Sequence, residues 1–142
     1  MTVLAFTDGA SRGNPGQSGI GIILKDEEGN ILASHFAFIG TTTNNVAEYK
    51  ALVYCLKMAQ ETKCTHLVVH SDSELMVRQL QGSYKVKDKG LREHFDEARR
   101  MLSSASFSFE IRHVAREQNR QADELANRGI NLRASFSDSN RI

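Results

Sequence analysis

The spacing of apolar residues changes partway along the chain, and this change constrains the fold more than any other feature. Short apolar runs with strand character come first, at residues 3–6, 20–24 and 31–39. From Val46 onward, apolar residues recur at helical spacing and alternate with further short runs. Consecutive strands joined by tight turns pair antiparallel, whereas strands separated by a helix pair in parallel through right-handed crossovers. The element order strand, strand, strand, helix, strand, helix, helix, strand, helix therefore predicts an α/β fold with a mixed sheet.

The later elements follow from the same patterns. Thr43, Asn44 and Asn45 offer caps for the first helix, whose apolar stripe continues to Leu56. Residues 134–142 are polar and rich in Ser and Asn, and we expect them to fray. The other expected elements are a strand at 67–69, helices at 75–80 and 91–102, a strand at 107–114 and a final helix at 122–130.

Size and composition limit the classes of function. The chain has 142 residues, of which 40% are hydrophobic and 25% charged, as is typical of one soluble globular domain. Its net charge of +1 excludes a uniformly basic coat for nucleic acid, but not a local basic face. No apolar stretch approaches the ~20 residues of a membrane helix, and the N-terminus lacks the pattern of a signal peptide. Two cysteines are too few for a disulfide framework, so we expect a cytoplasmic protein.

Two aspartates follow apolar runs at similar positions. Asp8 lies just past the first run and Asp72 just past the fourth, each directly behind a small hydroxyl residue, Thr7 or Ser71. Ligands of open α/β sheets gather at the carboxyl ends of parallel strands. If the two strands are parallel neighbours, the two carboxylates face each other. The alternative is that each aspartate only caps a turn or the following helix.

Two further carboxylates belong to predicted helices. Glu48 is expected in the first turn of the first helix, four residues before Leu52 of the apolar stripe. Asp123 lies near the start of the last helix, beside Ala122. Both flank an apolar face and could lean over the end of the sheet. The alternative is that each only complements the dipole of a helix N-terminus.

Four carboxylates at one rim of a sheet would repel one another strongly. At ~4 Å, two unit charges repel by about 4 kcal/mol at an effective dielectric near 20. Hard divalent cations such as Mg²⁺ take oxygen ligands, and two of them about 3.5–4 Å apart suit phosphodiester cleavage. Cys64, His66 and His70 share strand parity and raise the alternative of zinc, although no fourth ligand is apparent.

Four blocks of sequence, in order, resemble the ribonuclease H type 1 family over residues 2–129. The resemblance implies a ribonuclease H-like fold at residues 1–130, with a five-stranded mixed sheet in the order 3-2-1-4-5 flanked by helices. It implies a polar tail at 131–142 that is flexible or docked. The chain has no tryptophan and no room for the basic protrusion of larger members, so it is similar to the short subfamily. The blocks are Thr7-Asp8-Gly9-Ala10-Ser11 with Gly13-Asn14-Pro15-Gly16; Thr43-Asn44-Asn45-Val46-Ala47-Glu48-Tyr49; Ser71-Asp72-Ser73; and His113, Asn119 and Asp123-Glu124-Leu125-Ala126.

The resemblance implies an endoribonuclease that hydrolyses the RNA strand of RNA/DNA hybrids by two-metal-ion catalysis and leaves 5′-phosphate and 3′-hydroxyl ends. Two Mg²⁺ ions, with Mn²⁺ as a substitute, would be held in the substrate complex by the family's acidic quartet, here Asp8, Glu48, Asp72 and Asp123. His113 stands where the family has a mobile histidine that assists product release or proton transfer. Its sequence context is that of a strand end, so the alternative is a histidine hydrogen-bonded to backbone.

Recognition of RNA calls for groups that detect the 2′-hydroxyl, and amide side chains and backbone groups do so. By resemblance, the substrate-binding residues are Gly9, Ser11, Asn14, Thr43, Asn44, Asn45 and Asn119. Turn and cap chemistry is an additional role for the same residues. Glu74 stands where some members have Gln and is a weaker candidate. We expect a monomer that binds RNA/DNA hybrids, with double-stranded RNA as a further candidate substrate and no membrane partner.

Two other classes of function remain open at this point. The first is a binding module of the same fold without catalysis, but binding alone does not require four converging carboxylates. The second is a small-molecule phosphohydrolase, but such an enzyme needs a second catalytic Asp two residues after Asp8, where the chain has Ala10.

Overall fold

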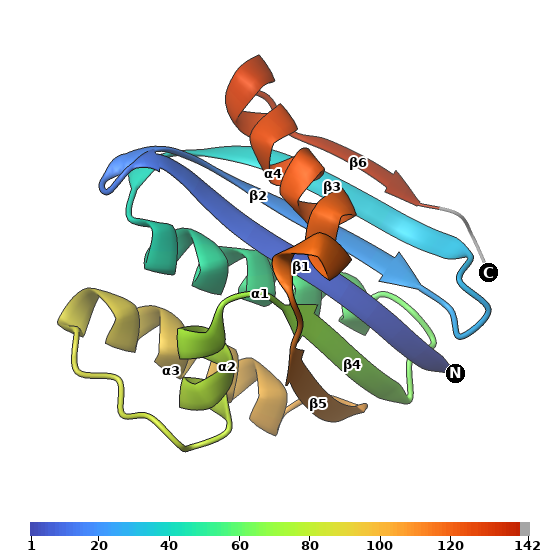
Figure 1. Ribbon diagram of the computed structural model, residues 1–142. Helices are drawn as coiled ribbons and strands as arrows, with labels where there is room; N and C mark the ends of the chain where they lie inside the picture. Colours follow the sequence, from blue (N-terminus) through green and yellow to red (C-terminus); the bar gives the residue numbers. More distant parts are fainter. Residues whose placement is uncertain (140–142) are drawn as a thin grey trace.

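A computed structural model of the protein describes residues 1–139. Its centre is one six-stranded sheet with the strand order β5-β4-β1-β2-β3-β6 (Figure 1). The strands are β1 (Thr2–Gly13), β2 (Gly16–Lys25), β3 (Ile31–Thr42), β4 (His66–Ser71), β5 (Ser108–His113) and β6 (Phe136–Ser139). The helices are α1 (Asn44–Gln60), α2 (Glu74–Leu80), α3 (Lys89–Ser103) and α4 (Arg120–Leu132), with a 3₁₀ turn η1 (Arg116–Asn119) before α4.

The sheet is mixed, as the sequence predicts. β1 pairs antiparallel with β2, and β2 with β3, because tight turns join them. β1 pairs parallel with β4, and β4 with β5, because helices intervene. The first five strands therefore have the expected order, 3-2-1-4-5. Residues 104–107 alone join α3 to β5, so there is no insertion between these two elements.

The sixth strand was not expected. Residues 136–139 do not fray, and of the two alternatives for the tail, flexible or docked, the docked one describes these residues. β6 pairs antiparallel with the edge strand β3, with Phe36 opposite Phe136. The two phenyl rings meet edge to face, with centroids 6.1 Å apart. Backbone pairing to an open sheet edge orders this polar segment, and such pairing leaves no mark in the hydrophobic pattern. Residues 140–142 of the expected tail lie outside the described residues.

The first strand also continues well past its apolar run. The sequence predicts that it ends before Asp8, but β1 extends to Gly13 and forms a long hairpin with β2. What ends near Asp8 is the parallel partner, because the last pair between β1 and β4 is Thr7 with Ser71. Beyond that point β1 has a strand on one side only, so polar side chains are accommodated there.

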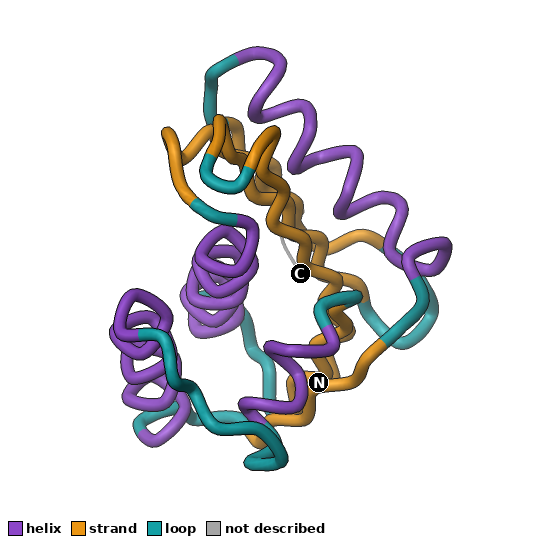
Figure 2. The backbone as a smooth tube through the Cα atoms, turned by 60° about the vertical axis from the view of Figure 1, so that its left-hand side comes forward, coloured by secondary structure: helices purple, strands orange, loops and turns teal. Residues whose placement is uncertain are grey.

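The helices lie in two layers on opposite faces of the sheet. α1 and α3 cover one face and α4 covers the other (Figure 2). The main core lies between the sheet and α1, where Ile22, Leu24, Leu52, Leu56 and Leu67 are almost fully buried. Among residues 1–139, no helix is long and apolar enough to cross a membrane.

Candidate active site

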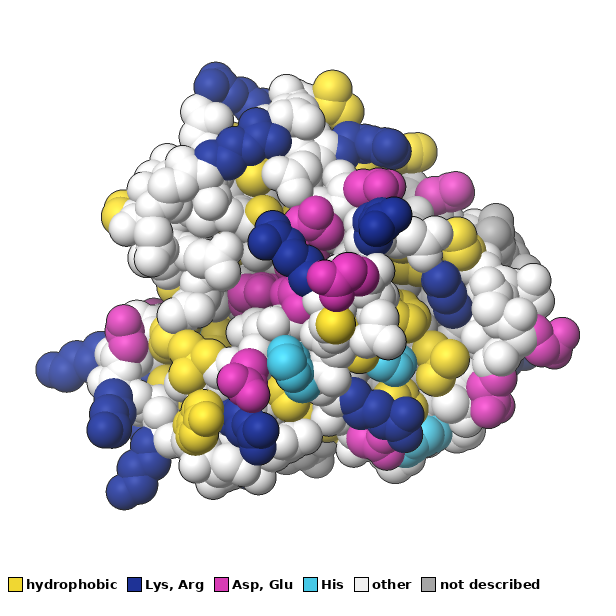
Figure 3. Space-filling model, viewed as in Figure 1, with side chains coloured by type: hydrophobic (Ala, Val, Ile, Leu, Met, Phe, Trp, Pro, Cys, Tyr) yellow, Lys and Arg dark blue, Asp and Glu magenta, His cyan; other side chains and the backbone are white. Residues whose placement is uncertain are grey.

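An open cleft of about 690 Å³ lies at the end of the sheet where β1 and β4 part. All four predicted carboxylates line it: Asp8, Glu48, Asp72 and Asp123. Figure 3 shows acidic side chains at the bottom of a hollow near the middle of this face, with basic side chains beside them. Residues from five separate segments of the chain thus meet at one site, as the sequence analysis predicts for the carboxylates.

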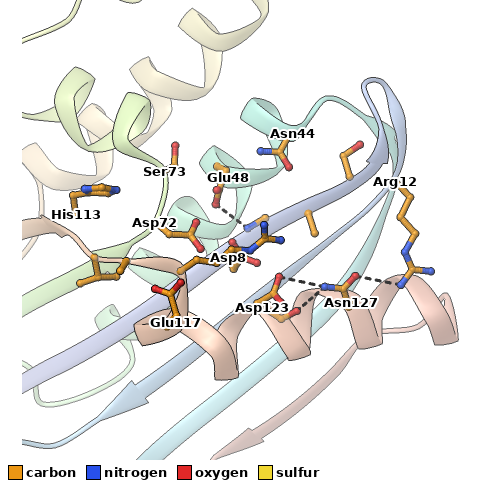
Figure 4. Close-up of a pocket in the computed structure, with 16 residues that line it drawn as sticks. Asp8, Arg12, Asn44, Glu48, Asp72, Ser73, His113, Glu117, Asp123 and Asn127 are labelled. Carbon is orange, nitrogen blue, oxygen red and sulfur yellow. Dashed lines mark hydrogen bonds between the residues drawn. The ribbon is translucent and has the colours of Figure 1, made fainter.

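Three of the carboxylates form a compact cluster (Figure 4). Asp8, Glu48 and Asp72 each offer one ligand oxygen, and these three atoms lie within 4.8 Å of one another. Asp8 and Glu48 are buried, at 5% and 3% exposure, and Asp72 is half-buried. Asp8 is one residue past the last parallel pair of β1, and Asp72 directly follows the end of β4. Neighbouring parallel strands therefore deliver the two aspartates side by side.

Glu48 is held in the cluster from the other layer. The buried N–H of Gly9 donates a hydrogen bond of 2.8 Å to Glu48 Oε1. A Cβ at position 9 would lie 2.2 Å from the carbonyl carbon of Ala47, so only glycine allows α1 to approach β1 this closely. The sequence analysis places Glu48 in the first turn of its helix, which is wrong. α1 begins at Asn44 with Thr43 as its cap, so Glu48 comes one turn later, directly over β1.

The alternative of a capping role does not hold for Asp72. The cap of α2 is Ser73, whose hydroxyl accepts a hydrogen bond of 3.2 Å from the N–H of Met76. Ser71 Oγ in turn accepts one of 3.1 Å from the N–H of Ser73. The two serines satisfy the turn, and the Asp72 carboxylate points into the cleft (Figure 4).

The cluster brings several carboxyl groups together, and two of them, Asp8 and Glu48, are buried. Burial raises the pKa of Asp8 well above its usual range, and the charges of Glu48, Asp72 and Asp123 raise it further. Burial also raises the pKa of Glu48, and Asp72 adds to this, against the opposing hydrogen bond from Gly9. The site therefore retains protons at neutral pH, and a cation bound there would displace them. An all-oxygen donor set of this kind can bind a hard metal ion.

The fourth carboxylate is at the edge of this cluster. Asp123 lies in the first turn of α4, lines the cleft, and is half-buried. Its Oδ1 accepts a hydrogen bond of 3.3 Å from Asn127 Nδ2, and Asn127 Oδ1 accepts one of 3.2 Å from Arg12. Asp123 contributes to the raised pKa of Asp8, so the two carboxylates interact across the cleft.

His113 is the last residue of β5, exposed, and on the wall of the same cleft. The expected strand-end position is thus found, although the strand stops one residue earlier than predicted. The zinc alternative receives no support within residues 1–139, where the only group of metal-ligating side chains is the acidic one. His66 contacts Ser108, and His70 contacts the carbonyl oxygen of Ala5.

The predicted substrate-binding residues divide into three sets. Gly9, Ser11 and Asn44 line the cleft. Asn14, Thr43 and Asn45 flank it: Asn14 Oδ1 accepts a hydrogen bond of 3.1 Å from the N–H of Asn44, which joins the β1–β2 turn to α1.

Asn119 is separate from both sets. It is 1% exposed, and its Nδ2 donates a hydrogen bond of 2.8 Å to the carbonyl oxygen of Thr7.

Several cleft residues escaped the sequence analysis. The polar ones are Arg12, Arg116, Glu117 and Asn127, together with Ser73, which belongs to a quoted block but was given no predicted role. Only Asn127 carries a usable signal, because it stands four residues after Asp123 and therefore on the same face of a helix. The others reach the cleft through the hairpin, the α2 cap and the 3₁₀ turn, which the hydrophobic pattern does not reveal.

Comparison with known proteins agrees with this geometry. A family model described as "Reverse transcriptase-like" matches residues 6–129. A ribonuclease HI of Halobacterium salinarum is 39% identical over 128 residues, which are 90% of this chain and 64% of that protein. A bifunctional protein of Mycobacterium tuberculosis is 37% identical over 94% of this chain and 37% of its own length. The chain thus spans less than two thirds of these curated relatives.

A solved structure extends the comparison to three dimensions. The crystal structure of LC11 ribonuclease H1 in complex with an RNA/DNA hybrid is 41% identical, with a TM-score of 0.87, over 92% of this chain and 98% of that one. The mixed sheet, its two helical layers and the acidic cleft define the ribonuclease H-like class. Within that class, the chain belongs to the type 1 ribonuclease H family, in its short form without the basic protrusion.

Proposed function

We propose that this protein is an endoribonuclease that hydrolyses the RNA strand of RNA/DNA hybrids and leaves 5′-phosphate and 3′-hydroxyl ends. One observation carries the proposal. Three carboxylates from β1, α1 and the end of β4 bring their ligand oxygens within 4.8 Å of one another at the floor of an open cleft. Family membership, and the hybrid bound to the LC11 relative, support the choice of substrate.

The residues of the cleft fit divalent metal ions. The donors are all carboxylate oxygens, two of them are buried, and the raised pKa values of Asp8 and Glu48 express the repulsion that a cation would relieve. We assign two Mg²⁺ ions, with Mn²⁺ as a substitute, to Asp8, Glu48, Asp72 and Asp123 in the substrate complex. When bound, such ions activate a water and stabilise the charge on the leaving oxygen.

The protein's own groups then orient the hybrid. The N–H of Gly9 fixes Glu48, so that this carboxylate does not turn away when substrate enters. Asn44, linked to Asn14, presents amide groups that suit a 2′-hydroxyl at one end of the cleft. His113 lies on the cleft wall, where its imidazole can transfer a proton at a phosphate oxygen or assist release of the product.

The proposal extends to the setting of the reaction. We assign catalysis to residues 1–130, with residues 131–142 as an appended tail, and we propose a monomer in the cytoplasm. Two buried cysteines, Cys55 and Cys64, are both free thiols, which suits a reducing compartment. Double-stranded RNA is a candidate second substrate, because it offers the same 2′-hydroxyl and phosphate groups that the cleft is proposed to contact.

A cleavage assay tests the proposed function. A hybrid labelled on the RNA strand is incubated with the protein and Mg²⁺, Mn²⁺ or EDTA, and the product ends are mapped. The same assay uses double-stranded RNA and double-stranded DNA. We expect metal-dependent cuts in the hybrid with 5′-phosphate ends, no cuts in EDTA, and intact DNA because the 2′-hydroxyl contacts are lost.

A matched pair of variants makes the assay specific to the cleft. Asp72→Asn should abolish cleavage, whereas Asp96→Asn on α3 should keep it, since Asp96 is an exposed ion-pair partner of Arg92. Cleavage that survives in EDTA or in Asp72→Asn would overturn the proposed mechanism. A wild-type protein that binds hybrid without cutting it would instead identify a binding module.

A further inference from the structure

A chain of three polar side chains links the β1–β2 hairpin to the fourth carboxylate (Figure 4). Arg12 donates from Nη2 to Asn127 Oδ1 over 3.2 Å. Asn127 Nδ2 donates to the carboxylate Oδ1 of Asp123 over 3.3 Å, and to the backbone carbonyl oxygen of Asp123 over 3.0 Å. Both ends of the Asn127 amide are therefore occupied, one by a cation from the hairpin and one by a predicted metal ligand.

Asn127 is not needed to dock its helix. α4 approaches the sheet through backbone contacts: a Cβ at Gly21 would lie 2.2 Å from the carbonyl oxygen of Ala122. The buried side chains Ala126 and Ile130 complete this face. Asparagine is also a poor residue for a helix interior, so propensity does not account for it. What the Asn127 amide adds is the orientation of its partners.

Asp72 and Asp123 are the two carboxylates of the cleft that are only half-buried, so packing alone does not orient them. Asp8 and Glu48 are buried, and Glu48 is fixed by the N–H of Gly9. Asp123 is half-buried and is not a member of the compact cluster formed by the other three. Because α4 is fixed at its backbone, the direction of the Asp123 side chain depends on its own contacts, which are the hydrogen bond from Asn127 Nδ2 and the interaction with Asp8 across the cleft.

Arg12 has donors to spare. It is exposed and lines the cleft, and among residues 1–139 no carboxylate lies within ion-pair distance of it. One nitrogen of its guanidinium is used by Asn127, and the remaining N–H groups of that planar fork suit the oxygens of a phosphate.

We propose that Asn127 is a positioning residue, which aims Asp123 at the metal site and couples it to Arg12, the contact for a backbone phosphate of the hybrid. The part that concerns Arg12 rests on the proposed function. The part that concerns Asp123 and metal stands apart from substrate. Residues that orient metal ligands typically change metal affinity or activity by about 10–100-fold when they are removed.

Two measurements separate these parts. Mn²⁺ affinity without substrate is measured by calorimetry, and kcat and KM are measured on the hybrid. Asn127→Ala should weaken Mn²⁺ binding and lower kcat by about 10-fold or more, since Asp123 loses its orientation. Arg12→Ala should raise KM and leave the Mn²⁺ affinity of the free protein unchanged. Asn127→Ala should also raise KM, because Arg12 loses the partner that holds it. In the double variant, the loss in kcat/KM should therefore be smaller than the product of the two single losses.

Asn131→Ala is the matched control. Asn131 lies one turn beyond Asn127 on the same helix, is exposed, and does not line the cleft. It should match the wild type in Mn²⁺ affinity, kcat and KM, and urea unfolding should show that all the variants fold. Wild-type Mn²⁺ affinity and kcat in Asn127→Ala would overturn the positioning role. Losses that multiply in the double variant would overturn the coupling to Arg12. A wild-type chain that leaves the hybrid intact would overturn the proposed function, and the Mn²⁺ affinities alone would then decide the role of Asn127.

Discussion

Replacement of Asp72 by Asn should stabilise the metal-free protein while it removes activity. The ligand oxygens of Asp8, Glu48 and Asp72 lie within 4.8 Å of one another. At that separation, two unit charges repel by about 3.5 kcal/mol at an effective dielectric near 20. Asp8 and Glu48 retain protons because burial and neighbouring charge raise their pKa values, so only part of this repulsion is present at neutral pH. We expect Asp72→Asn to raise the free energy of unfolding by about 1–3 kcal/mol in EDTA.

The same cluster fixes the sign of the pH dependence. The pKa values of Asp8 and Glu48 are higher in the folded protein than in the unfolded chain, so the folded state binds more protons. Their contribution to stability is complete below the usual carboxyl pKa of about 4, and it is lost as the pH rises through their raised values. The metal-free wild type should therefore become less stable from pH 5 to pH 8.5, and Asp72→Asn should lose less over this range.

Urea unfolding followed by circular dichroism, in EDTA at pH 5 and pH 8.5, measures both effects. Asp96→Asn is the control, because it removes one aspartate from an exposed ion pair, and such pairs contribute about 1 kcal/mol at most. Mg²⁺ should stabilise the wild type and the control, but Asp72→Asn much less. The reasoning is refuted if Asp72→Asn is no more stable than the wild type at pH 8.5 in EDTA.

Three further outcomes follow from single contacts. Gly9→Ala should lower the free energy of unfolding in urea by about 3 kcal/mol or more and weaken Mn²⁺ binding, because its Cβ meets the backbone of Ala47 at 2.2 Å. Gly90→Ala is the control and should lower it far less, since the nearest neighbour of its Cβ is a side-chain oxygen at 3.2 Å. Equal losses would contradict the packing argument. Asn119→Ala should cost about 1–3 kcal/mol, because the buried carbonyl oxygen of Thr7 loses its 2.8 Å partner; an unchanged urea midpoint would show that this bond contributes little. Mn²⁺ affinity, followed by electron paramagnetic resonance, should rise with pH above 5 as protons leave Asp8 and Glu48, and a flat profile would mean that they do not titrate with metal.

The parts of the fold that follow from local pattern could be predicted, including the mixed sheet and the order of its first five strands. Asp8 and Asp72 could also be located, because short buried strands precede them and parallel pairing brings strand ends together. The residues at which strands end were harder to predict from the sequence. The long β1–β2 hairpin contains polar residues beyond Asp8, which read as a loop, yet antiparallel pairing keeps them extended.

Contacts between distant segments had no local signal. β6 consists of exposed residues that are ordered by the edge of β3. The bond between Arg12 and Asn127 spans 115 positions, so neither residue alone indicates it. Glu48 was placed one turn too early, because Thr43, Asn44 and Asn45 are all acceptable caps and only the Thr43 hydroxyl serves.

The direct test of the account is to locate the metal. Crystals of the protein soaked in Mn²⁺ and measured at the manganese absorption edge would show each ion by its anomalous scattering. The account predicts a peak bonded to oxygens of Asp8, Glu48 and Asp72, and no such peak in crystals of Asp72→Asn. Manganese bound only elsewhere on the wild-type protein, or a cluster without metal at saturating Mn²⁺ and pH 8.5, would contradict it.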